Sequence, residues 1–137
     1  MELLPLGTLT IEIDQHTVVA GTPAGTRIVG EALTCHWVSD RVIAEQHGKM
    51  SHDWLMLNAD GSVSVDARLL LMTDDGAPIT ITYRGKAAKH PAEGGIVYTT
   101  PVFETGAERY LWLNGIQAVG RGVRVDKILT YELYQLS

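Results

Sequence analysis

The stretch from Ser51 to Arg84 constrains the fold more than any other part of this sequence. It contains two short polar connections, at 58–61 and 73–76, and each ends in Asp-Gly. A glycine at the end of such a connection supplies the positive φ that closes a tight turn between two strands. The segments joined by the turns are Trp54–Leu57, Val63–Met72 and Ile79–Arg84. The pattern predicts three antiparallel strands connected as a meander.

Other segments also have the character of strands. Leu9, Ile11 and Ile13 alternate with polar residues, which predicts a first strand over about 6–13 with one buried face. Further strands are expected at 27–33, 36–45, 96–104, 116–120 and 128–136. Between the strands expected at 96–104 and 116–120, Thr105 and Glu108 have the spacing of a capping box. This spacing predicts a short helix over about 106–113 that ends at Asn114-Gly115.

These elements predict a single all-β domain over residues 1–137. A chain of 137 residues can bury a hydrophobic core without disulfides or metal. About eight antiparallel strands would have exposed edges, and closure into a barrel removes them. We therefore expect an antiparallel, closed or nearly closed β-barrel of about eight or more strands with one short helix. A sandwich or jelly roll is the alternative.

Composition and charge exclude some partners. The net charge is −5 and the eleven Lys and Arg residues are scattered, so a nucleic-acid surface is not expected. The longest apolar run is Leu69–Met72, far shorter than the roughly 20 residues of a membrane-spanning helix, so no membrane span is expected either. Residues 1–14 lack the pattern of a secretory signal, and the single cysteine, Cys35, cannot form an internal disulfide. We expect a cytoplasmic protein.

Several short blocks resemble a known family. Asp-Ala-Arg at 66–68, Thr-Asp-Asp-Gly-Ala at 73–77, Phe-Glu-Thr-Gly at 103–106 and Trp-Leu-Asn at 112–114 are similar to the bacterial and fungal DUF3237 family, also called UPF0311. The resemblance covers roughly the second half of the chain. The family usually has a glycine-rich stretch before its Asp-Trp pair, and this chain differs there. The resemblance implies a closed or nearly closed β-barrel and brings no established activity.

Four charged residues are the candidates for catalysis. Asp66 and Arg68 share one face of their predicted strand, where Arg68 can hold a carboxylate or enolate and Asp66 can orient it. The alternative for this pair is a structural salt bridge that braces the barrel. Asp53 and Glu104 are the other candidates, because a carboxylate at the wall of an apolar cavity has a raised pKa and can act as an acid or base. Alternatively, both only satisfy backbone N–H groups.

Aromatic side chains near these polar positions are the candidates for substrate binding. Aromatic rings with a few polar groups line small-molecule pockets, and they also fill barrel cores. Arg121 is added because it can meet an anionic ligand at a barrel mouth. The set is Trp54, Tyr83, Tyr98, Trp112 and Arg121.

The histidines do not have the spacing of a metal site. His36, His47 and His52 occur with Glu45 in one short stretch, but the His-x-His-and-Glu pattern of cupins is absent. We expect neither a metal nor another cofactor. Cys35 is next to His36 on an extended segment, so the two side chains face opposite sides and the imidazole cannot activate the thiol.

The sequence favours a barrel that binds a small apolar or aromatic carboxylic or carbonyl compound in its lumen. Cofactor-independent isomerase, cyclase or lyase chemistry is the enzymatic form of this hypothesis. The alternative is a non-catalytic binding module or a homo-oligomeric assembly module. An enclosed cavity with carboxylates that point inward would favour the first, and a filled lumen with a large apolar outer patch would favour the second.

Overall fold

The computed structural model describes residues 1–137 and contains ten strands and two short 3-10 helices. The strands are β1 (Leu3–Thr22), β2 (Gly25–Val38), β3 (Ile43–Gln46), β4 (His52–Leu57), β5 (Val63–Thr73), β6 (Pro78–Ala87), β7 (Val97–Thr99), β8 (Val102–Glu104), β9 (Ala118–Val125) and β10 (Ile128–Leu136). The helices are η1 (Pro91–Glu93) and η2 (Glu108–Gly115). Neither helix has the length and apolar character needed to span a membrane.

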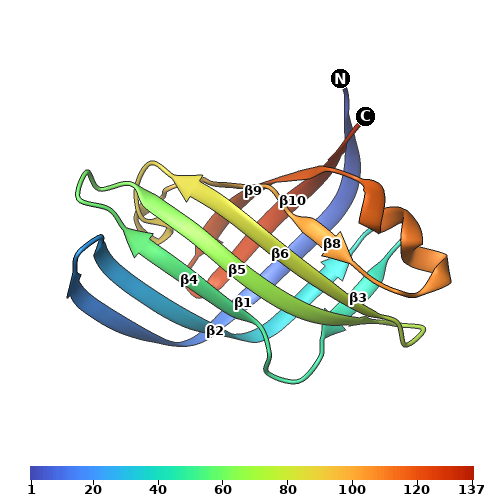
Figure 1. Ribbon diagram of the computed structural model, residues 1–137, viewed down its shortest axis with the longest axis horizontal. Coiled ribbons are helices and arrows are strands. Elements are labelled where there is room, and N and C mark those ends of the chain that lie inside the picture. Colours follow the sequence, from blue (N-terminus) through green and yellow to red (C-terminus); the bar gives the residue numbers. More distant parts are fainter.

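Eight of the strands form a closed antiparallel ring. The ring runs β1-β2-β4-β5-β6-β7-β9-β10 and returns from β10 to β1. The short strand β3 pairs with β2 and β5, and β8 pairs with β6. Figure 1 shows the strands wrapped around one interior, with η2 at one end and the two chain termini side by side. The predicted all-β barrel is confirmed.

The central meander also forms as predicted. Gly61 has a φ of 86° and donates its N–H to the Asn58 carbonyl at 3.0 Å, and Gly76 has a φ of 87° and donates to the Thr73 carbonyl at 3.0 Å. On β5 the alternate residues Val63 to Leu71 are buried, which places their face inside the barrel. The residues between them face outward.

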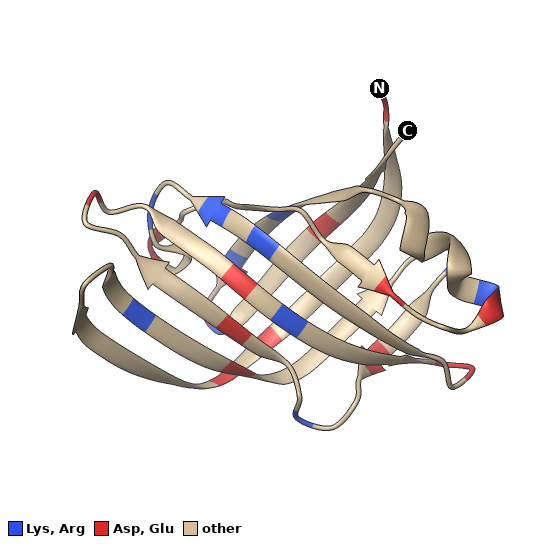
Figure 2. Cartoon of the chain, viewed as in Figure 1, with Lys and Arg blue, Asp and Glu red and all other residues tan.

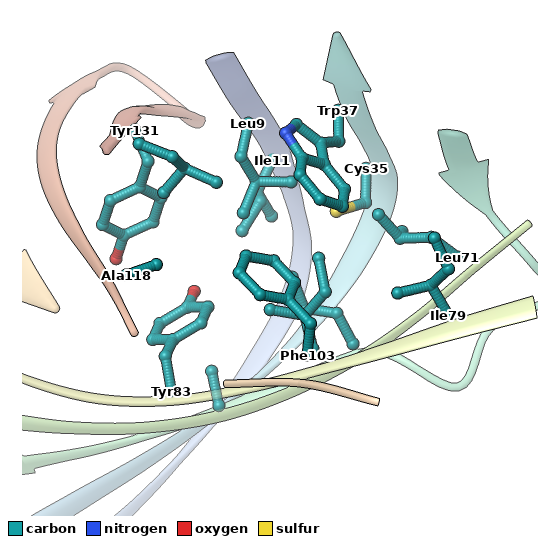
Figure 3. Packing of buried hydrophobic residues seen from close by; sticks show 14 of the residues in the cluster. Leu9, Ile11, Cys35, Trp37, Leu71, Ile79, Tyr83, Phe103, Ala118 and Tyr131 are labelled. Atoms are coloured by element: carbon teal, nitrogen blue, oxygen red, sulfur yellow. The ribbon is translucent and has the colours of Figure 1, made fainter. Parts of the chain in front are cut away.

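Large side chains fill the half of the barrel nearest η2. Trp37 stacks on Phe103 with ring centroids 5.0 Å apart, and its Nε1–H donates to the Leu6 carbonyl at 2.8 Å. Leu71 and Ile79 are fully buried in the same core, as Figure 3 shows. This half of the interior is therefore packed with side chains.

Helix η2 is fixed over this packed end by polar contacts to the turn between β5 and β6. The Tyr110 hydroxyl donates to Asp75 Oδ1 at 2.8 Å, and Arg109 Nη1 forms an ion pair with Asp75 Oδ2 at 2.8 Å. Hydrogen bonds from Thr73 and Tyr110, with the charge of Arg109, lower the pKa of Asp75 to about 2. These contacts close one end of the barrel.

Two predicted strands are interrupted in the structure. The strand expected at 36–45 was wrong, because the Ser39 hydroxyl oxygen accepts the N–H groups of Arg41 and Val42 and turns the chain there. The strand expected at 96–104 divides into β7 and β8 at Thr100-Pro101, where the proline has no N–H for a ladder. The first strand is longer than predicted, and the strand expected at 116–120 runs instead from Ala118 to Val125.

The predicted helix is present but begins later, at Glu108, and is a 3-10 helix. The capping box is absent: the Thr105 hydroxyl accepts the N–H of Ala107, which lies before the helix. The N–H of Thr105 is bound by the side chain of Asn114 at 2.9 Å. The threonine therefore shapes the approach to the helix and does not cap it.

Candidate functional site

A cavity of about 280 Å³ lies inside the barrel at the end opposite η2. Most of its wall is apolar and comes from β1, β2, β4, β5 and β10. The apolar wall residues include Ile11, Ile13, Ile28, Leu55, Leu69 and Leu129. The wall also carries polar side chains, and an apolar wall with placed polar groups is typical of a small-molecule site. These polar residues are His16, Glu31, His52, Asp53, His90 and Arg124.

Asp53 is the buried carboxylate of this cavity. It lies on β4, where its cross-strand partners are Gly30 on β2 and Ala67 on β5. Its Oδ1 atom is buried and has no hydrogen-bond partner in the protein. Burial, with a smaller contribution from the charge of Asp66, raises the pKa of Asp53 to about 7, although the charge of Arg124 opposes this shift. Near neutral pH this carboxyl can therefore both donate and accept a proton.

Two tyrosine hydroxyls lie close to Asp53 in the interior. Tyr83 on β6 is the cross-strand partner of Ala67, and its ring packs edge-on against Tyr131 of β10 with centroids 5.4 Å apart. Both hydroxyl oxygens are buried and have no hydrogen-bond partner. In Figure 3 the two hydroxyl groups point toward each other. Burial raises both pKa values, so the phenols stay protonated and remain hydrogen-bond donors.

Arg124, His16 and His90 line the outer part of the cavity. Arg124 is half-buried on β9, and its Nε–H donates to the Asp126 carbonyl at 2.8 Å. His90 precedes η1, and its Nδ1 accepts the N–H of Ala92 at 3.0 Å. Burial lowers the pKa of His90, and the charge of Arg124 lowers it further. The mouth thus combines a cation with a neutral imidazole.

Two of the nine predicted site residues line this cavity, Asp53 and Tyr83. Asp66 and Arg68 are exposed on the outer side of β5, because Ala67 between them faces inward. They do not form the salt bridge considered for them, since Arg109–Asp75 is the one ion pair in the chain. Figure 2 shows charged residues of both signs along the outer wall formed by β4, β5 and β6.

The other predicted residues also lie away from the cavity. Trp54, Asp66 and Tyr98 line a separate groove of about 670 Å³ on the outer wall, which Arg27, Arg84 and Lys86 make basic. Glu104 is exposed on β8, and Arg121 is exposed on β9, where it pairs with Tyr98. Trp112 is half-buried on η2, beneath the guanidinium of Arg41 at 3.4 Å.

Arg124 and Tyr131 were not among the predicted site residues, and the sequence carries a signal for both. Ala118, Gly120, Gly122 and Arg124 alternate on the inner face of β9. A Cβ atom on Gly122 would lie 2.4 Å from Cε1 of Tyr131, so the glycine makes room for that ring. The small residues at alternate positions of β9, opposite the Tyr131 ring, therefore identify the inner face of this strand. Arg124 is the next residue on that face.

His16 and His90 were also missed, and we find no comparable signal for them. His16 lies in the extension of β1 beyond its predicted end, and His90 lies in a loop. No group of three or more His, Cys, Asp or Glu side chains is placed to hold a metal ion.

A family model described as "Protein of unknown function (DUF3237)" matches residues 1–136. The chain belongs to the DUF3237 family. The resemblance seen in the second half of the sequence therefore extends to nearly all of it. The first half also matches the family model, although its residues before Asp53 differ from the usual glycine-rich stretch.

One protein that is similar to this chain has a named activity. The chain is 33% identical over 78 residues to the hydroalkoxylation enzyme phnH of Penicillium herquei, a match that covers 57% of this chain and 46% of that protein. The match thus spans about half the length of this curated relative.

Two solved structures have the same fold. A beta-barrel like protein from Acinetobacter baumannii has a TM-score of 0.88 at 24% identity and covers 99% of this chain and 96% of its own. An enzyme from Penicillium herquei has a TM-score of 0.77 at 23% identity, with 98% of this chain and 94% of its own covered.

Proposed function

We propose that the cavity binds a small, largely apolar compound with a carbonyl or phenol group and catalyses the cofactor-independent addition of a hydroxyl group across a carbon–carbon double bond. The observation that carries this proposal is the Asp53 carboxyl, which is unpartnered in an apolar cavity beside the unpartnered hydroxyl of Tyr83. Unpartnered buried polar groups are costly, and a ligand that binds them offsets that cost.

The named relative supports this class of reaction. Hydroalkoxylation is the addition of an O–H group across a C=C bond, and the relative is named for it. The addition changes no oxidation state overall and releases no fragment, so its balance requires only a proton donor and a proton acceptor. When the hydroxyl and the alkene belong to one molecule, the product is a ring and the enzyme is a cyclase.

Asp53 can supply both proton transfers. In its protonated form it gives a proton to one alkene carbon while the substrate oxygen forms a bond to the other carbon. The π bond breaks, and the carboxylate then takes the proton from the former hydroxyl group. Asp53 ends in the state in which it began. A pKa of about 7 suits this cycle because the proton is then neither held too tightly nor lost too easily.

The tyrosines contribute by stabilising charge. The Tyr83 hydroxyl, with that of Tyr131 beside it, is a preorganised donor for a carbonyl oxygen of the substrate. In an enone substrate, C–O bond formation runs ahead of proton transfer from Asp53 to the carbon, so negative charge builds up on that oxygen until the proton arrives. A fixed donor in a cavity with little water stabilises this charge more than solvent does.

Cyclisation of 2′-hydroxychalcone to flavanone tests the proposal, since a phenol adds to a conjugated alkene in that reaction. Wild-type protein is expected to give flavanone faster than buffer and with one enantiomer in excess. Asp53→Asn is expected to lose the enantiomeric excess and at least about a hundredfold in rate, a typical effect of removing a general acid. Asp74→Asn, an exposed aspartate at the packed end, is the matched control and should keep full activity.

The enantiomeric excess separates catalysis in the chiral cavity from reaction in solution. Racemic flavanone formed at the buffer rate by folded wild-type protein would contradict the proposal. So would an unchanged enantiomeric excess in Asp53→Asn.

A homo-oligomeric assembly module is the second candidate function. It is favoured by the exposure of Trp54 (50%) and Tyr98 (59%) along the outer groove, since large aromatic side chains at the surface are typical of interfaces. Size-exclusion chromatography with light scattering tests it. A dimer or larger species that Trp54→Ser and Tyr98→Ser dissociate would support assembly, and a monomer at all concentrations would contradict it.

A further inference from the structure

We infer that Arg124 anchors a carboxylate at the mouth of the cavity, so that the natural ligand is an acid whose apolar body extends inward toward Asp53. This inference rests on the proposed function, because it assigns a ligand class to the same cavity. It adds a residue that fixes which end of the ligand remains near solvent.

The fold places Arg124 for this role. It is the one arginine that lines the cavity, and it continues the inner face of β9 after Gly120 and Gly122. Its cross-strand partner is Leu129, a buried wall residue of the same cavity. Arg124 itself is half-buried, so its charge is only partly screened by water.

Arg124 also lacks an acidic partner. Its Nε–H is bound to the Asp126 carbonyl at 2.8 Å, which fixes the base of the guanidinium, and no carboxylate oxygen lies within 4.0 Å of its nitrogens. This is notable in a chain with sixteen acidic residues and a net charge of −5. The two terminal nitrogens remain free, and a guanidinium held in this way binds a carboxylate with two parallel hydrogen bonds.

His90 provides a second donor at the mouth. Because its Nδ1 accepts the N–H of Ala92, the proton of the neutral ring lies on Nε2. Both Arg124 and His90 line the cavity, and the charge of Arg124 acts on the imidazole. A carboxylate bound by Arg124 would therefore meet a neutral donor beside it.

The acidic residues that line the cavity are Asp53 and Glu31. Glu31 lies on β2, and its cross-strand partner is His52 on β4, which also lines the cavity. Asp53 has a raised pKa and is largely uncharged below neutral pH. The resulting gradient, with a cation at the mouth and a neutral carboxyl inside, orients an acidic ligand with its carboxylate outward.

Binding of trans-cinnamate and trans-cinnamamide tests the anchor, since the two have the same shape and differ in charge. By calorimetry at about pH 6, wild-type protein is expected to bind cinnamate at least about tenfold more tightly than the amide. Arg124→Gln should abolish this preference, and Arg124→Lys should keep part of it. Arg84→Gln, an exposed arginine on the outer wall, is the matched control and should retain the full preference.

These binding measurements test the role of Arg124 independently of the proposed reaction. Equal affinity for the two ligands in wild-type protein, absence of cinnamate binding, or a preference that persists in folded Arg124→Gln would overturn the anchor. Enantiomerically enriched flavanone would still support the reaction in those cases, because 2′-hydroxychalcone carries no carboxylate. An Arg124-dependent preference together with racemic flavanone would support the anchor and overturn the reaction.

Discussion

Asp53 on β4 and Ala67 on β5 are direct cross-strand partners on the inner face of the barrel. Ala67 pairs in turn with Tyr83 on β6, so one row across three strands carries a carboxyl, a methyl and a phenol. The side chain of Ala67, in the middle of this row, is a single methyl group. Because it fills little space, the carboxyl and the phenol can both reach the same cavity.

The burial of Asp53 predicts a dependence of stability on pH. Its pKa is raised from 3.8 to about 7, so the folded state binds the proton more tightly than the unfolded state does. The contribution of this carboxyl is therefore most favourable below about pH 4 and is lost as pH rises through 7. Between pH 4 and 8, wild-type protein should lose on the order of 4 kcal/mol relative to Asp53→Asn. Urea unfolding of both proteins at each pH measures their free energies of unfolding. A difference between the two proteins that stays the same from pH 4 to 8 would refute the prediction.

The same pKa predicts the pH profile of the proposed reaction. Asp53 acts in its protonated form, so kcat/KM for 2′-hydroxychalcone, corrected for the buffer reaction, should be level below about pH 6 and fall above 7. Initial rates across this range measure the profile. A rate that instead rises through pH 7 would mean that the carboxylate is the active form.

Asp66 is expected to act on Asp53 through the barrel wall. Its negative charge, on the outer side of β5, contributes to the raised pKa of Asp53. Asp66→Asn should therefore move the falling limb of the pH profile to lower pH, and added salt should reduce the difference because Asp66 is exposed. Asp74→Asn, at the packed end, should leave the limb unchanged. An identical limb in Asp66→Asn would show that this charge is fully screened.

Gly122 is expected to tolerate no larger residue without cost. A Cβ atom there would lie 2.4 Å from Cε1 of Tyr131, whose ring is fully buried. Gly122→Ala should destabilise the fold by about 1–3 kcal/mol, the usual cost of overpacking. Gly106→Ala, where an added Cβ meets nothing within 4 Å, is the control. Equal unfolding midpoints for the two variants would contradict the packing argument.

Much of the barrel could be predicted from local sequence. The alternation from Val63 to Leu71 identified the buried face of β5, and Gly61 and Gly76 identified the two turns that define the meander. Both signals act over a few residues. The interruptions at Ser39 and Pro101 were missed because the residues around them continue a strand pattern, and only the local hydrogen bonds show the break.

The candidate site could be predicted only in part. Asp53 and Tyr83 were selected for their chemistry, but alternation alone does not say which residues on different strands share a cavity. That depends on register, which brings Asp53, Ala67 and Tyr83 into one row. Arg124 was missed because Gly120 and Gly122 weaken the strand signal before it. In the structure those glycines are the reason that the strand can continue past Tyr131.

The packed half of the barrel has a consequence for how the other half can change. Trp37, Phe103 and the contacts of η2 stabilise the fold far from the cavity. That reserve offsets the cost of leaving Asp53, Tyr83 and Tyr131 unpartnered at the other end. Cavity-wall residues such as Ile28 and Leu55 can then be substituted without loss of the fold. Substitutions in this half of the barrel alone can therefore change which ligand the cavity binds.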